Sequence, residues 1–483
     1  LVGAKHGQSI GWVAELLHFR SGKAMNPSHP AAGEQTTSIS PTMPAPVSFW
    51  QACAFWLKLG FVSFGGPAGQ IALMHQELVE NRRWISEQRF LHALNYCMLL
   101  PGPEAQQLAT YIGWLMHRTW GGVVAGVLFV LPSLFILVGL SWVYVAFGDL
   151  PLVAGVSYGI KPAVTAIVLH AAYRIGSRAL KNRGLWALAF AALVAIAVFK
   201  LPFPAIVAVS ALVGTLWGRW VPGAFKAGGG HAASGQRFGP ALIDDHTPTP
   251  EHARFRWPRL VKVVVAGALL WLVPMGVLVA TVGWGHTFTQ MGWFFSKAAL
   301  LTFGGAYAVL PYVYQGAVEQ FGWLTATQMM DGLALGETTP GPLIMVVAFV
   351  GFVGGHAKAA LGPDTLFLAG ALAATLVTWF TFLPSFIFIL AGGPLVESTH
   401  GNVNFTAPLT AITAAVVGVI VNLALFFAYH VWWPQGFEGR FDWVAALMAV
   451  AAAVALFRYK RSVVQVIAAS AVVGLLVSLV MPG

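Results

Sequence analysis

Long apolar stretches separated by short polar ones run from residue 47 to the end of the chain. Runs such as Leu185 to Phe199 are apolar on every side, so they lack the alternation of strands in a membrane β-barrel. A helix needs about 20 mostly apolar residues to cross a hydrocarbon core. The pattern predicts an all-α integral membrane protein with about 13 transmembrane helices, at 47–64, 86–117, 120–147, 152–176, 184–199, 204–220, 260–284, 287–303, 326–352, 364–391, 404–430, 441–457 and 461–480.

Composition agrees with a lipid bilayer as the surroundings. Hydrophobic residues make up 57% of the chain and charged residues 9%, whereas soluble domains carry roughly 25% charge. The net charge of +10 comes from basic residues dispersed among loops, and no nucleic-acid-binding motif accompanies them. Retention of basic loops on the cytoplasmic side explains this charge, so nucleic acid is not an expected partner.

The chain repeats itself. Residues 58–103 match residues 297–342 at a constant offset of 239, and later pairs match at an offset of 252. A period of this length indicates two duplicated halves. The matched residues are Lys58 with Lys297, Phe64-Gly65-Gly66 with Phe303-Gly304-Gly305, Glu80 with Glu319, Trp84 with Trp323, Pro101-Gly102-Pro103 with Pro340-Gly341-Pro342, and Leu131-Pro132-Ser133 with Leu383-Pro384-Ser385.

The two halves are predicted to be inverted with respect to each other. Six spans followed by one added crossing start the second copy on the opposite side of the membrane. Inverted repeats are typical of secondary transporters, whose binding site lies near the midplane where helices break. The predicted domains are a disordered extension (1–46), a first repeat (47–220), a polar, mobile, cytoplasmic linker (221–259), a linking transmembrane helix (260–284) and a second repeat (285–483).

Two motifs interrupt the apolar stretches in both halves. Glycine and proline cannot continue a regular helix, and irregular backbone at membrane depth must be buried or face water. A half-helix beginning there aims free N–H groups at the cavity, which favours an anion. Packing kinks are the alternative interpretation. The candidate substrate-binding residues of the breaks are Gly65, Gly66, Pro101, Gly102, Pro103, Gly304, Gly305, Pro340, Gly341 and Pro342.

Four cations are further candidates for binding an anion. Lys58 and Lys297 lie within apolar runs, where a charge is costly and needs polar company. Either lysine could instead extend its ammonium group to the membrane interface. Arg82 and Arg83 precede a tryptophan, and the planar guanidinium suits oxyanions. Anchoring at the interface is the alternative role for these arginines.

Two carboxylates at membrane depth are candidates for proton coupling. Glu104 follows the first Pro-Gly-Pro, and Glu337 precedes the second. Ionisable residues in such positions are functional candidates, although both could instead cap a half-helix or pair with a base. With two cysteines, Cys53 and Cys97, the chain lacks the ligands of a zinc site or a disulfide framework, and we expect no metal or cofactor.

The positive-inside rule predicts a cytoplasmic N-terminus. Arg82, Arg83 and Arg89 would then lie outside, which conflicts with the rule unless residues 68–100 fold back into the membrane. The residues placed on the cytoplasmic face are Arg118, Arg174, Arg178, Lys181, Arg183, the linker 221–259 and residues 458–461.

The stretch FGGPAGQIALMHQELVENRRWISEQRFLHALNYCMLLPGPEAQQLATYIGWLMHR resembles the N-terminal half of the chromate ion transporters. The resemblance covers residues 47–480, and Gly65, Gly66 and the first Pro-Gly-Pro match the family pattern. The second copy departs from this pattern, with Ala306 in place of proline and Leu343 in place of glutamate.

This resemblance implies a two-domain secondary transporter in the bacterial inner membrane. It would export chromate and confer chromate resistance, with sulfate as a competing analogue and the membrane potential or a proton gradient as the driving force. The alternatives are a sulfate or other oxyanion importer and a membrane-bound chromate reductase. Whether two copies form a homodimer is left open.

Overall fold

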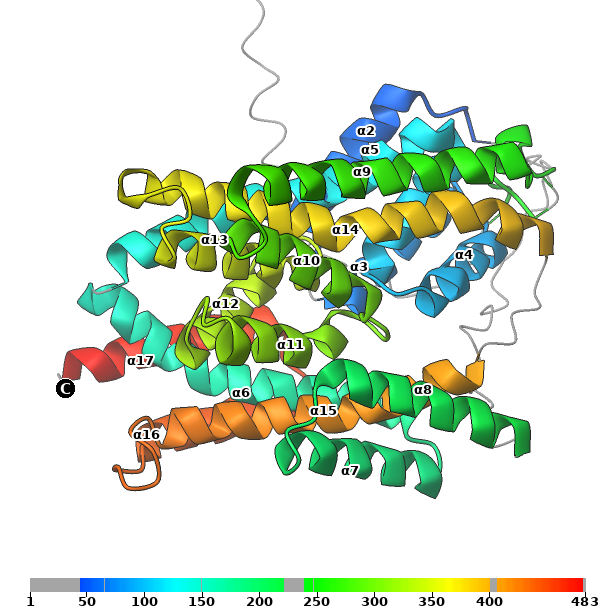
Figure 1. The fold of residues 1–483 in the computed structure, drawn as a ribbon. Coiled ribbons are helices and arrows are strands. Elements are labelled where there is room, and N and C mark those ends of the chain that lie inside the picture. Colours follow the sequence, from blue (N-terminus) through cyan, green and yellow to red (C-terminus); the bar gives the residue numbers. More distant parts are fainter. Residues whose placement is uncertain are drawn as a thin grey trace, which may run out of the picture. The chain divides into compact units, whose positions relative to one another are not determined.

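The computed structural model describes residues 44–64, 66–148, 150–220, 239–245, 247–399 and 406–480. Every element of regular structure named in these ranges is a helix (Figure 1), which confirms the predicted all-α fold. The predicted N-terminal extension lies almost entirely outside the described residues. The first repeat contains α2 (Phe49–Val62), α3 (Gly66–His75), η1 (Gln76–Asn81), α4 (Glu87–Leu99), α5 (Glu104–Phe147), α6 (Pro151–Ala179), α7 (Arg183–Ala197) and α8 (Phe203–Trp220).

A short turn and one long helix connect the repeats, namely η3 (Glu251–Ala253) and α9 (Trp257–Val282). The second repeat contains α10 (Thr287–Leu300), α11 (Ala306–Tyr314), η4 (Gln315–Gln320), α12 (Ala326–Thr338), η5 (Leu343–Met345), α13 (Val346–Ala357), η6 (Pro363–Thr365), α14 (Leu366–Thr399), α15 (Thr406–Trp432), α16 (Trp443–Phe457) and α17 (Val463–Val480).

The duplication is visible at the level of individual helix ends. The bounds of η1 and α4, moved by 239 residues, are those of η4 and α12. Ser86 and Thr325 cap α4 and α12 with their side chains. Lys200 (φ 53°) and Lys460 (φ 51°), at an offset of 260, share a left-handed backbone in the loops before α8 and α17. The residues that begin and end these helices are therefore repeated along with the helices themselves.

Equivalent helices of the two repeats run antiparallel. The backbone of α5 is non-helical at His117 and Arg118, and the chain reverses there, since Gly122 packs on Trp114. In the second part of α5, Gly126 packs on Phe386 of α14. The late part of α5 meets the start of α14, where the rings of Trp142 and Phe367 lie 5.2 Å apart. Since residues 131–133 in the second part of α5 match residues 383–385 of α14, these two helices are counterparts and the two repeats are inverted, as predicted.

At each end of the bundle, a histidine ring contacts a backbone carbonyl oxygen close to a point where the chain reverses. At the end we call the linker end, His117 Nε2 lies 2.9 Å from Val47 O, and His252 Nε2 of the linker lies 2.9 Å from Trp114 O. At the opposite end, which we call the far end, His286 Nε2 lies 3.1 Å from Ala360 O. Residues 47 and 286 are themselves a matched pair at the offset of 239.

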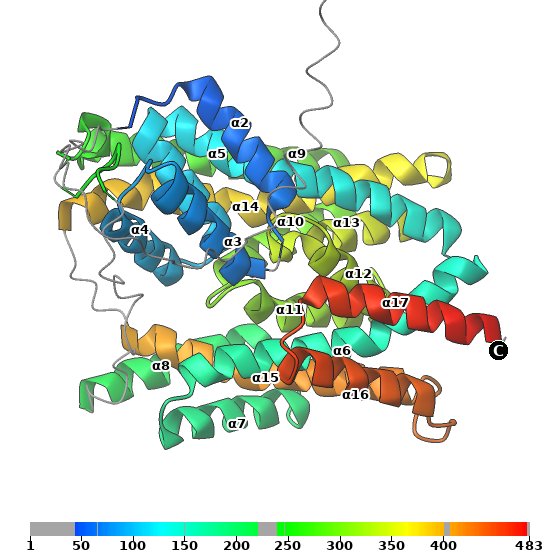
Figure 2. The ribbon, with the colours of Figure 1, turned by 180° about the vertical axis from the view of Figure 1, so that it is seen from behind.

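Four of the predicted spans enter the bundle and turn back. The rings of Phe55 on α2 and Trp84 lie 4.8 Å apart, because α3 and η1 return alongside α2 (Figure 2). Their counterparts Phe294 and Trp323 repeat this contact at 5.6 Å. Glycine and proline at the breaks reverse the chain, so these segments do not cross the membrane as single helices. The segments are 47–64, 86–117, 287–303 and 326–352.

The other nine predicted spans coincide with the second part of α5 and with α6–α9 and α14–α17. Seven helices in the described ranges are long and apolar enough to cross a membrane, and three further apolar helices are shorter. The described part of the chain is thus a multi-pass membrane protein with broken helices.

Part of the linker is packed against the first repeat, which corrects the prediction of a mobile connection for residues 239–245 and 247–256. Leu242 N donates to Arg83 O at 2.9 Å, and Arg89 Nη2 donates to Thr247 O at 2.6 Å. Ile243 is buried against the first repeat. These contacts place Arg83 and Arg89 at the linker end, because the chain after α2 folds back through α3 and η1. The conflict with the positive-inside rule disappears.

The long helices of each repeat pack on the terminal helices of the other. The backbone of α6 approaches that of α17 at Gly159 and Gly474, and α15 approaches α8 at Ala411 and Gly214. Small residues allow such close contact between helices in a membrane. The pairs are equivalent, since Gly159 matches Ala411 and Gly214 matches Gly474 at offsets of 252 and 260.

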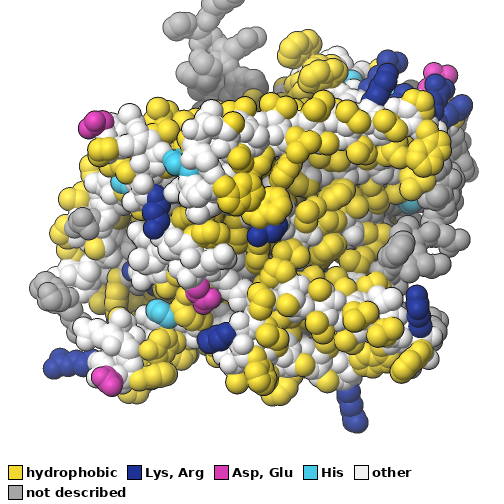
Figure 3. Space-filling view, in the orientation of Figure 1, with side chains coloured by type: hydrophobic (Ala, Val, Ile, Leu, Met, Phe, Trp, Pro, Cys, Tyr) yellow, Lys and Arg dark blue, Asp and Glu magenta, His cyan; other side chains and the backbone are white. Residues whose placement is uncertain are grey.

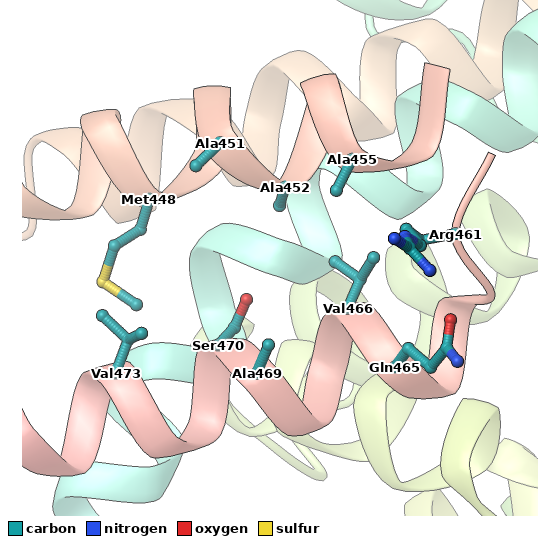
Figure 4. Close-up of a pocket in the computed structure, with 10 residues that line it drawn as sticks. All are labelled: Met448, Ala451, Ala452, Ala455, Arg461, Gln465, Val466, Ala469, Ser470 and Val473. Atoms are coloured by element: carbon teal, nitrogen blue, oxygen red, sulfur yellow. The ribbon is translucent and has the colours of Figure 1, made fainter. Parts of the chain in front are cut away.

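The outer surface is apolar, as a bilayer requires. Hydrophobic side chains cover much of the face that carries α9 and α14 (Figure 3). A groove between α16 and α17 is lined mostly by alanine and other apolar side chains, with Arg461 at one end (Figure 4).

Candidate functional site

The four breaks meet in reciprocal hydrogen bonds between the repeats. Gly102 N of the first Pro-Gly-Pro donates to Thr302 O beside the second Phe-Gly-Gly, at 2.8 Å. Gly341 N of the second Pro-Gly-Pro donates to Ser63 O beside the first Phe-Gly-Gly, also at 2.8 Å. Residues 63 and 302 are a matched pair at an offset of 239. The breaks of the two repeats therefore cross at one place, which we call the centre.

Two serines line the centre in the same reciprocal manner. Gly102 packs on Ser385, and a Cβ added to Gly341 would lie 2.7 Å from Ser133 Cβ. Both serines are buried, at 0% and 1% exposure for Ser133 and Ser385. The repeated Leu-Pro-Ser triplet was visible in the sequence, but nothing in it indicated that each serine faces the other repeat.

Two buried glutamines hold the breaks. Gln70 Nε2 donates to Gly341 O, and Gln107 Nε2 donates to Pro101 O at 2.8 Å and to Ser385 Oγ at 3.4 Å. These amides tie α3 and α5 to the non-helical backbone. Sequence reasoning missed both glutamines, because their counterparts in the second repeat are apolar.

Several buried polar atoms at the centre have no hydrogen-bond partner among the residues that the structure describes. They include the hydroxyls of Ser63 and Ser133 and the carbonyl oxygens of Gln70 and Gln107. Each hydroxyl can donate a hydrogen bond, and buried polar groups normally have partners. The centre therefore has unused capacity to bind a polar ligand.

Half-helices begin at the centre and add backbone donors. Here α5 begins at Glu104 and α11 begins at Ala306, after Gly305 (φ 95°), and within the described ranges no side chain caps either N-terminus. Free N–H groups and the helix dipole both favour an anion at such ends. Gly66 (φ 71°) and Gly304 (φ 81°) turn the chain at the breaks. Gly65 lies outside the described residues.

The predicted cations lie in different surroundings. Lys58 is half-buried on α2, near the first break. Lys297 is exposed on the outer side of α10, with Nζ 5.6 Å from the ring centroid of Trp293. Arg82 pairs with Glu77 at 3.1 Å at the linker end. Arg83 is exposed there. The structure therefore brings the prolines and glycines together, but not these arginines or Lys297.

The two predicted carboxylates lie beside the breaks. Glu337 is buried and accepts a hydrogen bond from Tyr307. Arg174 of α6 lies close enough to interact electrostatically with Glu337 and with Tyr307. Glu104 is half-buried in the first turn of α5. Arg174 is a cation near the centre that sequence reasoning assigned only to the cytoplasmic face.

A basic pocket opens at the linker end. It is lined by Arg118, Arg256, Arg259, His252 and Glu251, with Thr119 beside them. Burial lowers the pKa of His252, and the nearby charges of Arg118 and Arg259 lower it further. Like charges thus converge in this pocket, which favours the approach of anions at this end.

Inverted repeats whose broken helices meet at a buried polar centre define a membrane transporter of the inverted-repeat class. A sequence profile described as Chromate transporter matches residues 50–215 and 289–475. The chain belongs to the chromate transporter family.

Curated relatives span nearly the same length. The Chromate transport protein of Pseudomonas aeruginosa is 33% identical over 449 residues, which cover 92% of this chain and 95% of the relative. The Chromate transport protein of Cupriavidus metallidurans is 28% identical over 443 residues, covering 91% and 96%. The Probable chromate transport protein of Synechococcus elongatus is 27% identical over 379 residues, covering 78% and 83%. No solved structure is significantly similar to the chain.

Proposed function

We propose that the protein exports chromate from the cytoplasm across the bacterial inner membrane and thereby confers chromate resistance, with sulfate as a competing analogue. The relatives named as chromate transport proteins support the substrate. The observation that carries the binding site is the reciprocal pair of hydrogen bonds at the centre, from Gly102 to Thr302 and from Gly341 to Ser63. A site built from both repeats can open alternately to either side as one repeat rocks against the other.

The centre suits a tetrahedral oxyanion. Such an ion accepts hydrogen bonds on every oxygen, and the hydroxyls of Ser133 and Ser385 and the free N–H groups of the half-helices are donors. Lys58 and Arg174 supply positive charge from α2 and α6. We propose that the other described break residues, including Gly304, form the backbone of this site.

The distribution of basic residues supports a cytoplasmic linker end. Arg83, Arg89 and the basic pocket around Arg118 all lie there. Cytoplasmic loops carry an excess of Lys and Arg. The pocket would concentrate chromate at the entrance, and Arg82 would contribute to the same field. The N-terminus would then be cytoplasmic too, because Val47 lies at this end.

The membrane potential favours export of a dianion. Moving one charge across 100 mV gains about 2.3 kcal/mol, so a dianion gains about 4.6 kcal/mol. This free energy sustains roughly a thousandfold gradient. Import of the same ion against the potential would need a coupled cation.

The proposal is tested with everted membrane vesicles that contain the protein, an imposed potential and labelled chromate. Protein-dependent accumulation that sulfate blocks is the expected result. Sulfate entry into right-side-out vesicles without chromate accumulation in everted ones would instead make the protein an oxyanion importer. Protein-dependent reduction of chromate, followed by its absorbance, would favour a reductase.

The two central serines provide the first prediction. Ser133→Ala and Ser385→Ala should each raise the KM for chromate, because a hydrogen bond to a charged ligand contributes about 1.5–3 kcal/mol, or roughly 10- to 100-fold. The measurement is the concentration dependence of chromate accumulation. Ser210→Ala is the matched control, since this buried serine of α8 donates to Ile206 O within its own helix. Unchanged KM in both central variants would remove the serines from the site.

The two matched lysines should differ. Lys58→Ala is expected to lower chromate export at least about tenfold, because a cation near a buried anion site is worth more than one in water. Lys297→Ala should leave export within about twofold, because surface charges contribute little. Initial rates at equal amounts of protein decide this. Equal losses in the two variants would mean that both lysines act outside the centre.

A further inference from the structure

Asp331 is a buried carboxylate that the site at the centre does not use. It lies on α12, in the half of the bundle between the centre and the far end, and its exposure is 5%. Tyr144 of α5 donates a hydrogen bond to Oδ2 at 2.8 Å. The other oxygen, Oδ1, has no hydrogen-bond partner in the described structure. Asp331 and Tyr144 belong to different repeats, so this bond links the repeats between the centre and the far end.

The surroundings of Asp331 contain one opposite charge. Lys161 of α6 lies close enough to interact with it electrostatically, but the ion pairs within 4.0 Å in the described structure do not include these two residues. The other helices packed on α12 include α13, α15 and α17, which carry no Asp, Glu, Lys or Arg; their titratable side chains are His356 of α13 and Tyr429 and His430 of α15. Glu337, on the same helix and nearer the centre, is held by Tyr307. Asp331 is thus an incompletely satisfied carboxylate in an apolar region.

We propose that Asp331 binds the proton that this transporter exchanges for its anion. This inference rests on the proposed function. A proton from the far end adds to Oδ1 and converts the carboxylate to a neutral carboxylic acid. Burying an ionised carboxylate costs several kcal/mol, whereas the neutral acid is buried at far lower cost. The far end therefore closes around the protonated form.

The free-energy cost of burying an ionised carboxylate also drives the reopening of the far end. Glu337 lies on α12 between Asp331 and the second break and passes the proton toward the linker end. Once the proton has left, the buried carboxylate is unfavourable, and opening of the far end returns it to water. If the anion-loaded protein takes this step, each cycle carries one proton inward and one dianion outward.

Asp331→Asn separates proton binding from anion transport. Asparagine has a similar shape to the protonated aspartic acid but cannot take up or release the proton. The purified protein is reconstituted into liposomes, and two quantities are measured: chromate-driven proton flux with an internal pH dye, and exchange of labelled for unlabelled chromate. We expect D331N to lose proton flux at least about tenfold while exchange stays within about twofold. Glu319→Gln is the control, an exposed carboxylate of the same repeat, and should retain both.

The outcomes are distinct. Absence of chromate exchange in the wild type would refute the proposed function. Exchange in the wild type without proton flux would overturn only the inference about Asp331. Proton flux that persists in D331N but disappears in E337Q would assign the proton to Glu337 instead. Loss of exchange together with proton flux in D331N would show a structural role and would also overturn the inference.

Discussion

Replacing Gly102 with alanine should abolish most chromate transport. The backbone φ of Gly102 is 127°, a region that residues with a Cβ rarely adopt. An added Cβ would also collide with Ser385 Oγ and lie 2.7 Å from Gln107 Nε2. Backbone strain costs about 1–3 kcal/mol, and the shift would break the hydrogen bond to Thr302. We expect the initial rate of chromate accumulation in everted vesicles to fall at least about tenfold.

The inverted symmetry supplies a companion variant and a control. Gly341→Ala should have a similar effect, because φ is 101° there and a Cβ would meet Ser133. Gly139→Ala lies on α5 with open space around the added methyl group, so transport should be unchanged. Normal rates in both G102A and G341A, with normal amounts of folded protein, would show that the centre is not the transport site.

The breaks could be predicted from the sequence because glycine and proline act locally. A run such as Leu100-Pro101-Gly102-Pro103 interrupts a helix whatever lies around it. The duplication then indicated inverted halves. The partners of the breaks could not be predicted, since the hydrogen bond from Gly341 to Ser63 joins residues far apart in the chain. The crossing of the breaks is a property of the packed bundle alone.

The length of an apolar stretch did not predict whether the chain crosses the membrane there or turns back. The stretches 47–64 and 287–303 are hydrophobic enough to be counted as spans, but hydropathy does not register that the chain turns back after them. The same turn moves Arg83 and Arg89 to the linker end. Polar composition likewise concealed Ile243, whose burial against the first repeat anchors part of the linker.

Comparison of the two copies selected repeated residues as candidate functional residues and missed functional candidates that are not repeated. Lys297 matches Lys58, yet it is exposed on α10 beside Trp293. Asp331 has His92 as its counterpart, so the duplication did not draw attention to it. Burial, which the repeat pattern does not contain, distinguishes these positions.

Glu397→Gln should open the linker end of the protein. Glu397 of α14 pairs with Arg89 of α4 at 3.0 Å, with side-chain exposures of 4% and 12%, and it also accepts a hydrogen bond from Tyr111. This buried pair joins the two repeats. Removing one partner of such a pair costs about 3–5 kcal/mol, because the other charge stays buried without compensation. We expect a lower thermal unfolding midpoint and faster maleimide labelling of Cys97, a buried thiol of α4, in a Cys53→Ser background.

A double-mutant cycle distinguishes a bond that closes the linker end from a general loss of stability. The variant with both Arg89→Met and Glu397→Gln removes both charges, so it should be more stable than Glu397→Gln alone. Labelling of Cys97 should stay fast in it, because the link between the repeats is still missing. Glu80→Gln is the control, since its partner His75 is in the same repeat and its side chain is 41% exposed. Slow labelling in the Glu397 variant would mean that other contacts keep the linker end closed.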